Sequence, residues 1–180
     1  MLEYAEGGSL WDYIYKYQHE HEGEAIPMDR VVIWAWQAAE GLACLNKRGI
    51  LHRDIHVINM FLDKDQNIKI GDFGAASVDG NYGLLRYREK HQLWYQKEGQ
   101  WKAETSVRSE IFALGSALWH MVTGQEMYQE LYRNDVAELK RRMQEKELPK
   151  APNPSPLLAE VIEGCWKLKC GSMDEVVAGI

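Results

Sequence analysis

Hydrophobic residues recur at helical spacing along most of this chain. Residues 109–122 are apolar at almost every position, which predicts a helix buried on all sides. Ser9 and Ser172 can each cap a helix, because an acidic residue follows three positions later. Ser155 followed by Pro156 marks the start of another helix. We expect helices that begin at residue 9 and then span 31–47, 109–122, 135–146, 156–166 and 172–180.

Strand signals are short and few. Apolar runs at 60–62 and 68–70 flank the polar turn 64–67 and predict a β-hairpin. Residues 2–5 are expected to be extended, whereas residues 75–107 show no period and are expected to be irregular. The predicted fold class is therefore mainly α, of the α+β type, with one short β-hairpin.

Length and composition favour one globular domain. The chain has 180 residues, 46% hydrophobic and 27% charged, and a formal net charge of −6. This charge argues against non-specific nucleic-acid binding, which needs a basic surface. Three cysteines without a CxxC pair favour a reducing compartment. No apolar run is long enough to span a bilayer and no signal-peptide pattern is present, so we expect a cytoplasmic or nuclear protein without a membrane partner.

Side chains suited to phosphoryl transfer occur at a defined spacing. Asn59 follows Asp54 by five residues, and Asp72 follows Asn59 by thirteen. A carboxylate at Asp54 can orient or deprotonate an acceptor hydroxyl, while Asn59 and Asp72 can hold magnesium on the phosphates. The alternative is a hairpin with a solvated aspartate at each end.

Taken in full, residues 52–54 (HRD), Asn59 and residues 72–74 (DFG) resemble the catalytic half of a eukaryotic-type protein kinase. Residues 2–10 are similar to the hinge of that family, and residues 109–115 to its buried helix αF. The resemblance covers nearly the whole chain and implies a protein-kinase-like C-lobe. It also implies that residues 1–180 form a partial protein kinase domain from which the N-lobe is missing.

The resemblance implies a nucleotide site at the hinge. The backbone at Glu3 and Ala5 would form hydrogen bonds with adenine, and Leu10 and Phe61 would pack beneath its ring. Core packing is an equally good interpretation of Leu10 and Phe61, since the adenine ring would complete that core. The cofactors implied are ATP and Mg²⁺.

Catalytic roles follow from the same resemblance. Asp54 would be the catalytic base or hydroxyl-orienting group, and Asn59 and Asp72 would be the magnesium ligands. His56 occupies the position at which Ser/Thr kinases usually have a lysine that contacts the γ-phosphate. A histidine there is shorter and mostly neutral near pH 7, so a fixed positive charge is lost.

The resemblance also implies supporting roles. The rings of His52 and Phe73 would stack, and Glu110 would accept backbone N–H groups of the catalytic loop. Arg53 would pair either with a phosphate on the activation segment or with a local carboxylate.

Some family features are missing. The APE motif is absent, and residues 87–89 are its nearest substitute. Glycine-rich loop, strand lysine and αC glutamate are also absent, so we expect an N-lobe or a partner protein to cover the top of the C-lobe. The resemblance implies ATP-dependent phosphoryl transfer to Ser/Thr hydroxyls of a protein substrate by an incomplete chain. The alternative is a catalytically inactive, pseudokinase-like interaction module.

Overall fold

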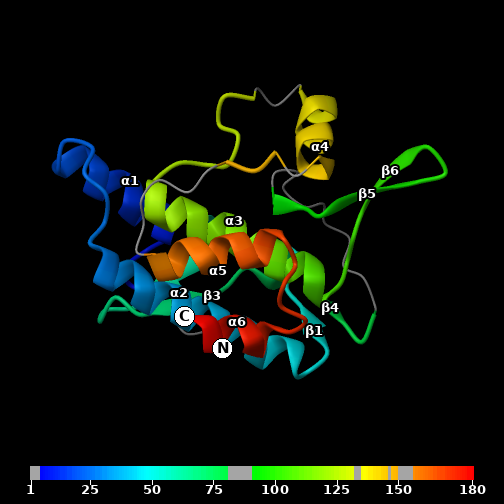
Figure 1. The fold of residues 1–180 in the computed structure, drawn as a ribbon. Coiled ribbons are helices and arrows are strands. Elements are labelled where there is room, and N and C mark those ends of the chain that lie inside the picture. The colour runs from blue at the N-terminus through cyan, green and yellow to red at the C-terminus, as the bar shows by residue number, and fades with distance from the viewer. Residues whose placement is uncertain (1–4, 81–90, 132–134, 146, 150–155) are drawn as a thin grey trace.

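The computed structural model describes residues 5–80, 91–131, 135–145, 147–149 and 156–180. Within these ranges helices form most of the molecule and the sheets are small, as the sequence predicts. Helix α3 (Val107–Thr123) runs through the middle of the molecule, with α5 (Pro156–Trp166) packed along it (Figure 1). Helix α2 (Met28–Asn46) contacts α3 as well and is covered by α6 (Met173–Gly179).

Helix α1 (Leu10–Glu20) begins where the sequence predicts. The Oγ of Ser9 accepts the backbone N–H of Asp12 at 3.1 Å and donates to its carboxylate at 2.6 Å. This reciprocal cap holds the turn, and the buried side chains of Leu10 and Ile14 attach the helix to the core.

Helix α2 starts three residues before its predicted position and holds a hairpin against the core. The fully buried Trp34 donates its indole N–H to the carbonyl of Gln66 at 2.8 Å. The amide of Gln37 donates to Asn67 and accepts the N–H of Ile68, each at 2.8 Å. These bonds fix the turn between β2 (Met60–Leu62) and β3 (Ile68–Ile70), so the predicted hairpin is confirmed.

The expectation that residues 75–107 are irregular is wrong in part. Strand β4 (Ser77–Val78) pairs with β1 (Ile50–Leu51), and β5 (Trp94–Lys97) pairs with β6 (Gln100–Ala103). The β5–β6 ribbon extends away from the helices (Figure 1). Most side chains of the ribbon face solvent, so its sequence does not show the alternation of apolar and polar residues by which strands are predicted.

Helix α3 is buried from residue 110 to residue 122, as predicted. A capping box between Ser106 and Ser109 starts it two residues before its predicted position, and Gly124 ends it at φ 68°. Ser172 caps α6 by accepting the N–H of Glu175 at 3.3 Å. The predicted cap at Ser155 lies outside the described residues. In the described ranges, we find no helix that combines the length and the apolar character needed to cross a membrane.

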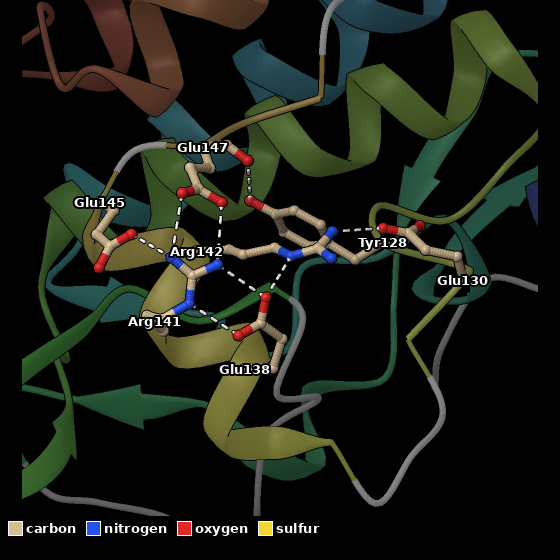
Figure 2. A network of polar contacts seen from close by, with 7 residues as sticks. All are labelled: Tyr128, Glu130, Glu138, Arg141, Arg142, Glu145 and Glu147. Carbon is tan, nitrogen blue, oxygen red and sulfur yellow. Dashed lines mark hydrogen bonds and ion pairs between the residues drawn. The ribbon is translucent and has the colours of Figure 1, made fainter.

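Helix α4 (Val136–Gln144) buries Leu139 and Met143 in the core, and its charged side chains form ion pairs. The carboxylate of Glu138 accepts from Arg141 at 2.8 Å and from Arg142 at 2.9 Å, and these two cations lower the pKa of Glu138 to about 2. At the other side of the helix, the ammonium of Lys140 lies 3.9 Å from the ring of Trp94 in β5. Figure 2 shows the network of polar contacts around this helix, which includes Tyr128, Glu130, Glu138, Arg141, Arg142, Glu145 and Glu147.

Candidate active site

Residues 52–59 form the predicted catalytic loop. Glu110 in helix α3 joins this loop to the centre of the molecule. The carboxylate of this residue, which is 2% exposed, accepts the backbone N–H of Arg53 at 2.8 Å and the side-chain amide of Asn46 at 2.8 Å. Burial raises the pKa of Glu110, and the two donated bonds oppose that rise. Arg53 lies in the left-handed region at φ 68°, a conformation that a non-glycine residue adopts at a cost. The predicted contact of Glu110 with the loop is therefore confirmed.

Asp54 and Asn59 meet directly. The Nδ2 of Asn59 donates to the backbone carbonyl of Asp54 and to its Oδ2, both at 2.8 Å. Asn59 is 5% exposed, while Asp54 is half-buried and faces a hollow. The asparagine thus fixes the orientation of a carboxylate that remains accessible.

Asp72 follows the β2–β3 hairpin and is joined to the same loop. The carbonyl of Gly71 accepts from the Nε2 of His52 at 2.8 Å, and the N–H of Gly71 donates to the carbonyl of Asn59 at 2.9 Å. The ring centroids of His52 and Phe73 lie 5.0 Å apart, so the two side chains are neighbours as predicted, but the ring planes are tilted by 53° and not stacked. Asp72 itself has φ 54° and is exposed, so a second strained residue stands at this site.

The donor atoms at Asn59 and Asp72 fit a hard divalent cation. With its nitrogen engaged by Asp54, Asn59 has its Oδ1 left without a hydrogen bond from any described residue. The carboxylate of Asp72 receives one weak bond, from the N–H of Gly74 at 3.3 Å. One amide oxygen and one carboxylate suit Mg²⁺, which retains several waters when it binds.

The residues predicted to bind the nucleotide differ in how deeply they are buried. Leu10 is fully buried, whereas Phe61 and Ala5 are half-buried. The ring of Phe61 lies so close to Gly71 that an added Cβ would come within 2.8 Å of it, so glycine is required there. Glu3 lies outside the described residues.

The segment at Ser9 is held against β2. Gly7 donates its N–H to the carbonyl of Leu62 at 2.8 Å, and Leu62 donates to Gly8 at 2.9 Å. This pairing brings Ser9 opposite Phe61. Residues far apart in the chain are thereby joined beside the predicted adenine site.

His56 lies in a different environment from Asp54. Its ring is 1% exposed and lies 4.5 Å from the ring of His91 and 6.2 Å from that of His120, measured between centroids. The Nδ1 of His56 accepts the backbone N–H of Ile58 at 3.0 Å.

The hollow beside Asp54 contains residues that the sequence did not indicate. Its cavity volume is about 20 Å³, which is room for little more than one water molecule. Glu104 and Thr105 line it, and both lie just before α3 in the stretch where no periodicity was found. No local signal could have found them, because only the folded chain brings them to the catalytic loop. The predicted substitute for APE at residues 87–89 lies outside the described residues.

Comparison with known proteins agrees with this geometry. A family model for protein tyrosine and serine/threonine kinases matches residues 1–172. The chain is 26% identical over 168 residues to serine/threonine-protein kinase STY46 of Arabidopsis thaliana, which covers 93% of this chain and 28% of that protein. It is 32% identical over 170 residues to serine/threonine-protein kinase Nek4 of Mus musculus, which covers 90% of this chain and 20% of that protein.

A third relative, serine/threonine-protein kinase Nek9 of Xenopus laevis, is 28% identical over 167 residues, covering 92% of this chain and 15% of that protein. The chain therefore spans under a third of the length of these relatives. Since the family match extends over nearly the whole chain and the residues it implies for catalysis meet in space, the chain belongs to the protein kinase family.

Proposed function

We propose that this chain is the catalytic portion, hinge and C-lobe, of a protein kinase that transfers the γ-phosphoryl group of ATP to Ser or Thr hydroxyls of protein substrates. The observation that carries the proposal is the pair of bonds by which Asn59 orients the carboxylate of Asp54 beside an open hollow. The names of the relatives, all serine/threonine-protein kinases, support the choice of acceptor.

In this proposal the acceptor hydroxyl approaches Asp54. The oxygen of the acceptor hydroxyl attacks the γ-phosphorus of ATP. The bond from that phosphorus to the β–γ bridging oxygen breaks, and ADP leaves with the electron pair. Asp54 orients the hydroxyl and takes its proton. Asn59 keeps the carboxylate in place through both of its bonds to Asp54.

Asn59 and Asp72 would hold Mg²⁺, which neutralises charge on the phosphates when it is bound. The hydrogen bond from the N–H of Gly71 to the carbonyl of Asn59 joins the backbone next to Asp72 to that of Asn59, and so limits changes in the distance between the two proposed ligands. Ala5 and Glu3 would bind adenine through their backbone, above Leu10 and Phe61.

Phe73 is 41% exposed at the same site, and Phe61 beside it is half-buried. An N-lobe or a partner protein that packs on these rings would exclude water from the nucleotide.

Two variants test the proposal in the full-length protein. We expect Asp72→Ala to abolish the thermal stabilisation that Mg-ATP gives to the wild type, because a magnesium ligand is lost. Asp54→Asn should keep that stabilisation and lose phosphoryl transfer to a protein substrate by about 10²-fold or more, since the base is removed. Asp65→Ala, an exposed carboxylate in the β2–β3 turn, is the matched control.

Full transfer activity in Asp54→Asn would contradict the role of this residue. A wild-type protein that binds Mg-ATP without transferring phosphate would favour the second candidate, an inactive interaction module. The observation in favour of that candidate is that the position at which kinases usually have a lysine is occupied by His56, whose side chain is 1% exposed.

A further inference from the structure

Three histidines from separate parts of the chain meet beneath the catalytic loop. His56 belongs to the loop, His91 to the segment between Phe73 and α3, and His120 to α3. Their side chains are 1%, 7% and 3% exposed in that order. The centroid of the His56 ring lies 4.5 Å from that of His91 and 6.2 Å from that of His120. Buried histidines are uncommon enough to require an explanation, and the transfer chemistry uses none of these three.

His56 holds the turn that carries Asn59. Its Nδ1 accepts the N–H of Ile58 at 3.0 Å, and its backbone carbonyl accepts the N–H of Asn59 at 2.9 Å. Asn59 in turn donates two hydrogen bonds to Asp54, so hydrogen bonds connect His56 to the proposed base through Asn59. A change in the His56 ring would therefore reach Asp54 through the short helix Val57–Asn59.

Both ring nitrogens of His56 have polar neighbours. An Nδ1 that accepts a hydrogen bond leaves the proton on Nε2, and the Oε1 of Glu126 is 3.6 Å from that nitrogen. Burial, and then the neighbouring His56, lower the pKa of His120 to about 4. The edge of His120 also meets the ring of Trp11, with centroids 5.8 Å apart. Aromatic packing at such distances fixes ring orientation.

We propose that His56 is a positioning residue, packed against His91 and His120, which sets the geometry of Asp54 and Asn59 and joins the segment that bears His91 to the catalytic loop. This role rests on the proposed function and replaces direct contact of His56 with phosphate. A residue that only filled space could be apolar. The bond to Ile58 requires an acceptor at the position of Nδ1.

Two substitutions separate an acceptor from a space-filler. His56→Asn places its Oδ1 near the position of the ring Nδ1 and so retains a bond to the N–H of Ile58. His56→Leu is apolar and lacks an acceptor. We expect His56→Leu to speed amide hydrogen exchange at Ile58 and Asn59 by about tenfold, the loss of one hydrogen bond, and His56→Asn to restore most of the protection.

Exchange at Leu42 in α2 shows whether each variant is folded, and His19→Leu, at an exposed histidine of α1, is the matched control. Unchanged exchange at Ile58 in His56→Leu would overturn the proposal. So would equal rates in His56→Leu and His56→Asn, because a purely space-filling side chain predicts that result.

The link to His91 is tested by combining variants. If the two rings act as one unit, His91→Leu should also speed amide exchange at Ile58. The double variant His56→Leu/His91→Leu should then exchange at Ile58 little faster than His56→Leu alone. Effects that multiply fully would show that His91 is independent of the loop.

Kinetics of the full-length protein complete the test. We expect His56→Leu to lower kcat with little change in KM for ATP, and His56→Asn to recover kcat. A loss confined to KM would overturn the positioning role. If the wild type proves inactive, the proposed function fails, whereas the exchange rates still decide whether His56 holds the loop.

Discussion

At the scale of single residues, Glu110 shows how one buried carboxylate organises the catalytic loop. It is 2% exposed and receives N–H groups from Arg53 and Asn46. Arg53 has a positive φ, and the charge-assisted bond from its own N–H offsets part of the strain of that conformation. Removal of the carboxylate would take this acceptor from the N–H of Arg53 and from one N–H of Asn46, whose amide also donates to the carbonyl of Ile50 at 3.2 Å.

We expect Glu110→Ala to lower the free energy of unfolding by about 2–4 kcal/mol, because a buried side chain is lost and the half-buried N–H groups of Arg53 and Asn46 lose a charge-assisted bond. Urea unfolding at pH 7 measures the loss. Glu160→Ala, at an exposed position of α5, should change stability by less than about 0.5 kcal/mol. Equal losses in the two variants would contradict the role of Glu110.

The pH dependence of Glu110 has a definite sign. Because burial raises its pKa in the folded protein, the carboxyl favours stability below its ordinary value of 4.5 and loses that contribution as the pH rises through the folded value. The stability of the wild type relative to Glu110→Gln should therefore decrease as the pH is raised from 4 toward 8. A difference that stays constant over this range would refute the prediction.

At the scale of elements, the contact between α3 and α5 depends on a glycine. A Cβ at Gly115 would come within 2.8 Å of the Cβ of Cys165 and 3.0 Å of Trp166. The indole N–H of Trp166 also donates to the Oγ of Ser116 at 3.1 Å, so the two helices cannot separate without loss of this buried bond. A side chain at residue 115 therefore has no room.

We expect Gly115→Ala to destabilise the protein by about 1–3 kcal/mol through overpacking, although alanine favours helix. Gly164→Ala is the matched control in α5, because a Cβ there would meet nothing within 4 Å. That variant should gain about 0.5–1 kcal/mol. Denaturant midpoints measure both, and equal stability of the two variants would exclude the packing explanation.

At the scale of the whole molecule, a single hydrophobic core joins every helix from α1 to α6. Helix α3 lies at its centre, and Leu118 is fully buried there. The catalytic loop rests on this helix through Glu110 and on the hairpin through Gly71. The active site should therefore lose its geometry together with the core rather than before it.

We expect Leu118→Ala to cost about 2–5 kcal/mol and to shift the whole unfolding transition, since it opens a cavity in this shared core. Far-UV circular dichroism and tryptophan fluorescence should give coincident transitions. Leu157→Ala, at a side chain that is 42% exposed, is the control and should have little effect. Separate transitions for the two probes would contradict a single core.

Most helices and the β2–β3 hairpin were predictable, because their signals are local. A cap at Ser9, a polar turn at 64–67 and an apolar stretch at 109–122 each act within a few neighbouring residues. The β5–β6 ribbon was missed because its strands depend on each other and not on an apolar face. Prediction therefore failed where pairing, not pattern, decides the structure.

The sequence by itself determined which side chains are available for the proposed chemistry, since the types and spacing of Asp54, Asn59 and Asp72 are independent of what surrounds them. Only the tertiary structure decided how these residues are held. The contact of Glu110 with Arg53 joins residues 57 positions apart, and His56 acquires its neighbours from distant segments. Side-chain type is a local property, whereas burial and orientation arise only when the core closes around them.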